Sequence, residues 1–415
     1  MKVYIRIFRK FQYPTGIWPG EIFGEKIWPI AKIPLYLSPV NNTLCFLGQV
    51  YFIMIKESSL PMLVDIYITM ALTVITGVRM LLPFFKKYHT LFEKYIKVIH
   101  LEHFRQEGRT CNQICDFIDK VSEYFAKYTI FIMLSALVFY NTPALYNNYQ
   151  NGVMASPNNM NLTKEFSIYL ILPGFDPEEN FYAATIYNLY GSYVCSVAFI
   201  TIDLMLCLMI FQIIGHLKLL ENNLRDVATD VLILHNESND EGAFTNSAIC
   251  NLFDERCNLF IANKLKKCVR HHLLFTNEIS DFYGPILAMN YLFHILTCCL
   301  LLFEISLKAT DTLTRFAALS AGIFGQLVQI SVVFELSANL APAVYSLPWA
   351  LMNASNRRLV GIILLHMQEP IHVHALGTVK VGHETMLAVS LQMFYGLLKT
   401  LSVNLTLTAL FTCRE

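Results

Sequence analysis

Hydrophobic residues along this chain come in long runs that are nearly free of charge. A helix of about 20 residues spans the hydrocarbon core of a bilayer, which is about 30 Å thick. Seven runs reach that length and predict spanning helices over residues 33–55, 60–83, 128–147, 183–213, 283–307, 314–338 and 384–412. The pattern therefore predicts an all-α integral membrane protein with seven transmembrane helices.

The composition agrees with a membrane protein. Hydrophobic residues make up 55% of the chain and charged residues 15%, whereas soluble domains carry roughly a quarter charged residues. The formal net charge is zero, so no overall field attracts nucleic acid. The amino terminus lacks the continuous apolar core of a signal peptide, and we expect the first spanning helix to target the chain.

Lysine and arginine are sorted between alternate connecting segments. The segments before the first helix, and after the second, fourth and sixth, hold about two dozen of them. The other segments hold Lys56, Lys164, Lys308 and Arg315. The positive-inside rule therefore predicts a cytoplasmic amino terminus, and seven crossings then place the carboxyl terminus outside. A sequon at Asn161, in a predicted outer loop, agrees and predicts glycosylation there.

Two cytoplasmic connections carry apolar residues at helical spacing, over 86–127 and 251–280. This pattern predicts helices that continue out of the membrane and form a cytoplasmic helical layer. Such a layer suits subunit contact, and folding back on its own chain explains the pattern as well. We expect two functional regions, with the first six helices in 1–338 and a cytoplasmic helix plus the seventh helix in 339–415.

Enzymatic chemistry finds little support in the sequence. The histidine pairs His271–His272 and His372–His374 lack the further ligands that a metal site needs. Cys111 and Cys115 lie one helical turn apart, which fits a redox pair or a chance spacing. No phosphate-binding glycine loop or nucleophile elbow is present. The sequence therefore predicts a protein that is not an enzyme, without cofactor or metal.

Several ionisable residues fall inside the predicted spans, where a lone charge in lipid is costly. They are Asp65, Arg79, Asp203, Glu304, Glu335 and Lys399. Most lie near a helix end, where a long side chain can reach the headgroups. Asp203 and Lys399 lie deeper, and they either pair with another helix or face a water-filled cavity.

Aromatic residues are dense in the predicted outer halves of the second, third, fourth and sixth helices. They are Tyr67, Phe139, Tyr140, Tyr187, Tyr190, Tyr193 and Phe316. An aromatic cavity with a few hydroxyl groups suits a small, weakly polar organic ligand. An interfacial aromatic belt with ordinary packing explains the same residues at least as well.

The last predicted helix is more polar than a lipid-facing helix tolerates. Its polar residues are Thr400, Ser402, Asn404, Thr406, Thr408 and Thr412. On a helix, positions 404, 408 and 412 form one stripe, and positions 402, 406 and 410 form another on the nearly opposite face. One stripe can pack on the bundle while the other lines an aqueous path, and interhelical hydrogen bonds on both faces are the alternative.

The carboxyl-terminal third resembles the insect odorant receptors. The resemblance rests on three stretches in order: AVYSLPWALMNASNRRLV with Tyr345 and Trp349, then HMQEPIHVHALGTVKVGHETM, then LQMFYGLLKTLSVNLTLTALF. Seven helices and an inside amino terminus fit the same family. One departure is Ser402, which lies between Leu401 and Val403 where relatives often have aromatic residues.

The resemblance implies a ligand-gated, non-selective cation channel in which four subunits surround one pore. It implies that the cytoplasmic helices anchor the tetramer and that the last helix lines the pore with Thr406, Leu407, Ala409 and Leu410. The connection between the fourth and fifth helices looks too short for the shared co-receptor. The chain therefore resembles an odorant-tuning subunit that joins the co-receptor in a heterotetramer, in the plasma membrane of olfactory dendrites.

The resemblance also implies a site for a small volatile organic ligand in the outer half of the bundle. The implied odorant-binding residues are Tyr67, Met70, Ala71, Phe139, Tyr140, Tyr187, Tyr190, Gly191, Val194, Phe316 and Ser320. A gustatory receptor of the same superfamily is an alternative, but its usual Thr-Tyr and Gln-Phe pairs are absent from the last helix. A G-protein-coupled receptor requires an amino terminus outside, and a transporter usually shows inverted repeats.

Overall fold

The structure is a computed structural model of the whole chain. It describes residues 2–240 except 27, 57, 108, 158, 160 and 161, then 352–367, 373–375, 379–381 and isolated positions between 259 and 395. At most isolated positions are described in the spans predicted over 283–307, 314–338 and 384–412. The candidates that lie outside the described residues are Asn161, Phe316, Ser320, Thr406, Leu407, Ala409 and Leu410.

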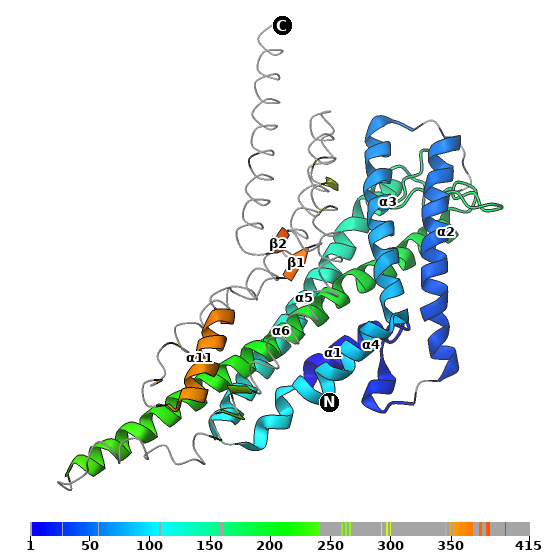
Figure 1. Cartoon of the computed structure of the whole chain (residues 1–415). Helices are drawn as coiled ribbons and strands as arrows, with labels where there is room; N and C mark the ends of the chain where they lie inside the picture. Colours follow the sequence, from blue (N-terminus) through cyan, green and yellow to red (C-terminus); the bar gives the residue numbers. More distant parts are fainter. Residues whose placement is uncertain are drawn as a thin grey trace, which may run out of the picture.

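Helices dominate the part of the chain that is described. They are α1 (Val3–Gln12), α2 (Ile33–Ile55), α3 (Leu60–Leu81), α4 (Lys86–Lys94), α5 (Arg109–Gln150), α6 (Phe181–Asp240) and α11 (Ala354–Met367). Figure 1 shows α2 and α3 side by side, with the long helices α5 and α6 running together past them. The first four predicted spans are thus confirmed as helical, because α2, α3, α5 and α6 cover nearly all of them.

Three described helices are long and apolar enough to cross a membrane. These segments are Met62–Phe84, Arg109–Gln150 and Phe181–His216. Helix α2 has 23 residues and is not among these three segments of the described chain. Helix α5 has 42 residues, about 63 Å at 1.5 Å per residue, and therefore extends beyond a bilayer core. The full set of seven crossings stays a prediction.

A small antiparallel hairpin departs from the all-helical prediction. Strand β1 (Val373–Ala375) pairs with β2 (Val379–Val381), and Val373 lies opposite Val381. Both strands alternate apolar and polar side chains and end in valine or alanine. Valine is enriched in strands because its branched side chain packs well on a pleated surface. The predicted all-α fold class is confirmed, and this hairpin of two three-residue strands is a small addition to it.

The prediction of one continuous helix over 86–127 is also wrong. Helix α4 passes into a π-helical turn (Tyr95–Ile99), a 3-10 helix (Leu101–Glu107) follows, and α5 begins at Arg109. The break lies at His100, whose buried imidazole Nδ1 accepts a hydrogen bond from the Glu102 backbone N–H at 3.2 Å. This contact satisfies a backbone group that the interrupted helix leaves without its usual partner.

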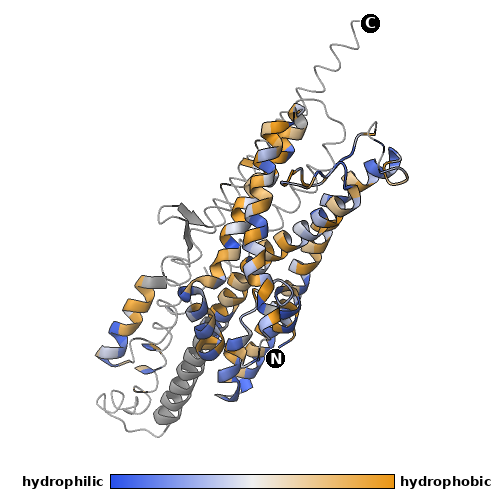
Figure 2. Ribbon diagram, turned by 90° about the vertical axis from the view of Figure 1, so that its right-hand side faces the viewer, coloured by the Kyte–Doolittle hydropathy of each residue, from blue (hydrophilic) through white to orange (hydrophobic). Residues whose placement is uncertain are grey.

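The short helices near the amino terminus pack on α5 and α6. Helix α1 buries Tyr4, Ile5 and Phe8 in the main hydrophobic core. Figure 2 shows hydrophilic residues gathered around this end of the bundle, while hydrophobic residues dominate further along the helices. In the described part of the predicted cytoplasmic layer, the amphipathic segments therefore fold back on their own chain.

An ion-pair cluster fastens this layer to α5. The Lys2 ammonium lies 2.7 Å from Asp119 and 2.6 Å from Glu102. The Arg105 guanidinium contacts Asp116 at 2.7 Å and Asp119 at 2.9 Å. Lys2, Arg105, Glu102 and Asp119 each have more than one partner, and such networks hold their geometry better than isolated surface pairs. The cluster joins the amino terminus, the 3-10 helix and α5.

Candidate ligand-binding site

The candidate odorant residues that the structure describes come from three helices. Helix α3 carries Tyr67, Met70 and Ala71, α5 carries Phe139 and Tyr140, and α6 carries Tyr187, Tyr190, Gly191 and Val194. All lie toward the end of the bundle that the sorting of basic residues places outside, here called the outer end. This placement follows because α3 and α6 begin at that end and α5 finishes there.

Two candidates lie in the packed interface between α3 and α6. Ala71 packs against a small cluster of Ile75 and Phe199. Val194 is buried in another cluster with Met80 and Ala198. The structure therefore brings these candidate positions of α3 and α6 against the same interface.

Two tyrosines of the candidate site donate hydrogen bonds across the fold. The Tyr140 hydroxyl donates to the backbone carbonyl of Ser167 at 2.7 Å. The Tyr187 hydroxyl donates to Asn41 Oδ1 at 2.8 Å and so links α6 to α2. Both side chains are only partly buried. Their positions are fixed by these bonds, which suits residues that line a defined cavity.

The remaining aromatic candidates are more exposed. Tyr67 is 48% exposed, Phe139 61% and Tyr190 53%. Exposed aromatic side chains near the predicted membrane interface also match an aromatic belt. The contact of these three side chains with a ligand stays a prediction.

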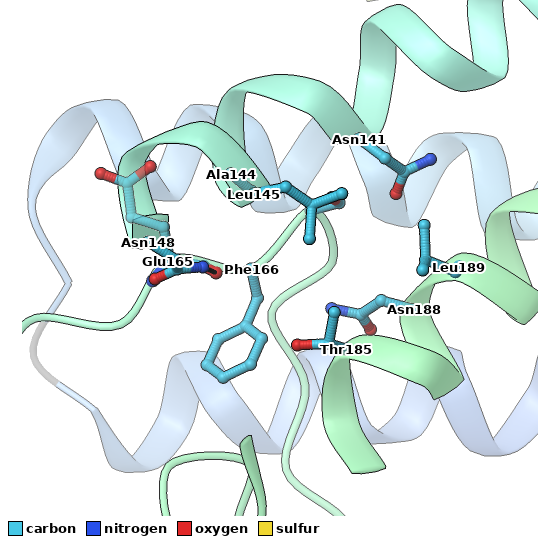
Figure 3. Close-up of a pocket in the computed structure, with 10 residues that line it drawn as sticks. Asn141, Ala144, Leu145, Asn148, Glu165, Phe166, Thr185, Asn188 and Leu189 are labelled. Carbon is cyan, nitrogen blue, oxygen red and sulfur yellow. Dashed lines mark hydrogen bonds between the residues drawn. The ribbon is translucent and has the colours of Figure 1, made fainter. Parts of the chain in front are cut away.

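A pocket lies between the outer ends of α5 and α6 (Figure 3). Its cavity volume is only about 10 Å³, room for roughly one water molecule and far below the 300–1,000 Å³ typical of small-molecule sites. The residues that line it are Asn141, Ala144, Leu145, Asn148, Glu165, Phe166, Ser167, Thr185, Asn188 and Leu189. The sequence reasoning missed these residues, although the amides at 141 and 148 near an outer helix end were a visible signal.

An unusual contact in the described interior is a buried ion pair between α3 and α6. Arg79 Nη2 lies 3.0 Å and 3.2 Å from the two carboxylate oxygens of Asp203. Arg79 Nη1 donates to the Phe199 carbonyl, and the guanidinium carbon lies 3.8 Å from the centroid of the Phe199 ring. The two residues are 0% and 4% exposed.

This pair decides two points that the sequence left open. Asp203 pairs with another helix, as one of the two alternatives predicted. The idea that Arg79 reaches out to the headgroups is wrong for this residue, because its side chain is fully buried and turned toward α6. A buried cation needs a compensating charge, and Asp203 supplies it.

Comparisons with known proteins identify the family. A family model described as 7tm Odorant receptor matches residues 60–400. The insect olfactory receptor OR5 from Machilis hrabei has a similar solved structure, with a TM-score of 0.68 and 14% sequence identity over 96% of this chain and 98% of that chain. The same receptor in complex with eugenol gives a TM-score of 0.66, with 14% identity over 96% and 97%.

No curated protein sequence matches this chain closely. At 14% identity, the likeness to OR5 shows a common fold and no more. The family model, in contrast, matches most of the sequence, and it describes membrane receptors rather than enzymes. The chain belongs to the odorant receptor family.

Proposed function

We propose that this protein is the odorant-tuning subunit of a ligand-gated, non-selective cation channel. In this proposal it assembles with the odorant receptor co-receptor as a heterotetramer in the plasma membrane of olfactory neuron dendrites. The main observation behind this proposal is the family match over residues 60–400. The fold that the chain shares, along nearly its whole length, with an insect olfactory receptor also supports the proposal.

The proposed ligand is a small volatile organic molecule bound in the outer half of the bundle. A solved relative with this fold is a complex with eugenol, which is a small molecule of that kind. In this chain, Ala71 and Val194 lie in the α3–α6 interface, while Tyr140 and Tyr187 are held in place by hydrogen bonds. We therefore keep all eleven candidates of the sequence analysis as the proposed site.

The proposed pore lies in the last helix. Thr406, Leu407, Ala409 and Leu410 would line it, with residues 339–415 serving as anchor and pore and residues 1–338 as sensor and scaffold. A ring of leucines can close a pore by excluding water, and hydroxyl groups can pass hydrated cations without strong selection. Odorant opens such a pore only if it prefers the open arrangement, and the usual scale of that coupling is about 1–3 kcal/mol.

Functional expression tests the proposal. The chain is expressed in a cell line alone and with a co-receptor, and cation current is recorded during application of an odorant panel. We expect current only from the pair. Absence of current from both, with surface expression verified, would refute the channel proposal.

Labelling of an amino-terminal epitope on intact cells separates the channel from a G-protein-coupled receptor. An inside amino terminus stays unlabelled until the membrane is permeabilised. Labelling of intact cells would contradict the orientation predicted from the basic residues. The same cells allow the proposed glycosylation at Asn161 to be checked by enzymatic removal of glycans.

A further inference from the structure

The connection between α5 and α6 folds back along the outer end of the bundle. Residues 164–172 of this connection, here called the strap, contact the flanking helices α5 and α6 and also α2, which is distant in sequence. The backbone N–H of Ile171 donates to the carbonyl of Gly48 in α2 at 3.1 Å. Figure 1 shows the connection beside the upper ends of α2 and α3. The strap therefore lies across the bundle end and does not extend away from it.

Asparagine side chains hold the strap on α5 and α6. Asn148 Nδ2 donates to the Glu165 carbonyl at 2.6 Å, and Asn148 Oδ1 accepts from the Glu165 N–H at 2.9 Å. This amide satisfies both backbone groups of one strap residue, as a neighbouring strand would. Asn188 Nδ2 donates to the Ile168 carbonyl at 3.1 Å. Both asparagines are buried, so water competes little for these hydrogen bonds.

The underside of the strap is apolar and packed. Phe166 and Leu170 are buried, and the Tyr169 ring lies 5.6 Å from the Phe52 ring of α2. A methyl group on Gly48 would lie 3.0 Å from the Ile171 carbonyl oxygen. The missing side chain at Gly48 therefore lets the strap backbone approach α2 closely.

The strap also touches the candidate odorant site. Its Ser167 carbonyl accepts the hydrogen bond of Tyr140, and its Ile168 side chain lies 4.0 Å from the position of a methyl group on Gly191. In Figure 3 the strap passes between the ends of α5 and α6, and Phe166 projects into the space there. A molecule that approaches Tyr140 from the outer end meets the strap first.

We propose that the strap is a lid over the outer end of the odorant site, with Asn148 and Asn188 as its positioning residues. This inference rests on the proposed function. A lid that is closed in the resting protein slows both entry and exit of the ligand. Weakening the lid raises both rates together, so the ratio of the rates, and with it the odorant potency, changes little.

A disulfide between the strap and α2 tests the lid directly. A Cβ atom on Gly48 would lie 3.3 Å from Leu170 Cβ, close to the 3.5–4.5 Å found in disulfides. The double variant G48C/L170C is expressed with the co-receptor, oxidised, and then reduced from outside. The single variants G48C and L170C serve as controls under the same oxidation and reduction.

We expect the oxidised double variant to show odorant activation at least about tenfold slower than after reduction, with no such change in the single variants. A formed cross-link that leaves activation and washout rates unchanged would overturn the lid. Failure to cross-link would also overturn it, because the strap would then not lie against Gly48. Absence of odorant current from the wild-type pair would instead refute the proposed function.

Loosening the strap gives an independent test that needs no cross-link. N148A and N188A each remove hydrogen bonds to the strap. The net contribution of one typical hydrogen bond corresponds to roughly a fivefold change in the equilibrium between the closed and open strap. We expect activation and washout each to become about two- to tenfold faster, with potency nearly unchanged. Q150A is the matched control, because Gln150 lies on the same helix, is exposed, and donates to Tyr146. A change in potency with unchanged rates would contradict the lid.

Discussion

Replacing Asp203 with asparagine removes the negative charge that compensates Arg79 inside the bundle. Arg79 is completely buried, and its Nη2 atom lies 3.0 Å from Asp203. Breaking a buried pair on one side typically costs about 3–5 kcal/mol, because the remaining charge stays buried without compensation. The contact with the Phe199 ring remains, and such a contact contributes up to about 2 kcal/mol when desolvated. We therefore expect a loss of about 3 kcal/mol for D203N.

The assay is thermal unfolding of the detergent-solubilised protein, followed by size-exclusion chromatography of a fluorescent fusion after heating. At roughly 2 °C per kcal/mol for a large domain, D203N should lower Tm by about 6 °C. The matched control is E178Q, because Glu178 pairs with Lys56 on the surface. Exposed pairs contribute about 0–1 kcal/mol, and this control should shift Tm by less than about 2 °C.

A double variant distinguishes loss of the pair from loss of packing. R79L/D203L removes both charges together, and replacing a buried pair with apolar residues is often neutral. We expect R79L/D203L to be more stable than D203N, although it carries two substitutions. A Tm for D203N within 1 °C of the wild type, or a double variant less stable than D203N, would refute a compensated buried pair between α3 and α6.

Three further outcomes follow from the structure and from the proposed function. Burial lowers the pKa of His100 from 6.5 to about 4, so between these pH values the unfolded chain binds a proton that the folded chain does not. The free energy of unfolding should therefore fall by up to about 3 kcal/mol as the pH drops from 6.5 to 4. In thermal unfolding, H100Q should show a smaller dependence of Tm on pH over this range. Y140F removes the hydroxyl that donates to Ser167, and it should change which odorants activate while the reversal potential stays constant; an unchanged odorant profile would count against this site. L410A should alter basal leak or ion selectivity more than odorant potency, measured by ion substitution, and an effect on potency alone would contradict the pore assignment.

The amino-acid sequence alone determined where the first four long helices form. The ranges 33–55 and 60–83 agree closely with α2 and α3 because the signal is local. An apolar run of about 20 residues must satisfy its own backbone in lipid, and only a helix does so within one segment. The sequence also carried the family resemblance, since the three stretches near the carboxyl terminus are motifs of neighbouring residues.

The sequence did not determine where the helices break or what their polar residues contact. His100 ends one helical stretch because its side chain meets a backbone N–H two residues further on, and the same apolar spacing would also fit an unbroken helix. The strap depends on contacts between Gly48 and Ile171, and between Asn188 and Ile168. Neither contact leaves a pattern in the neighbouring sequence.

The charged pair shows the same division between local and tertiary information. Hydropathy placed Arg79 near the end of a span, where a long side chain can reach water. Only the packing of α3 on α6 brings it to Asp203, which is 124 positions away in the chain. Hydrophobic periodicity records how much of a helix must be buried, but it does not record which helix lies opposite. The tertiary structure alone therefore decided that this charge is compensated inside the bundle.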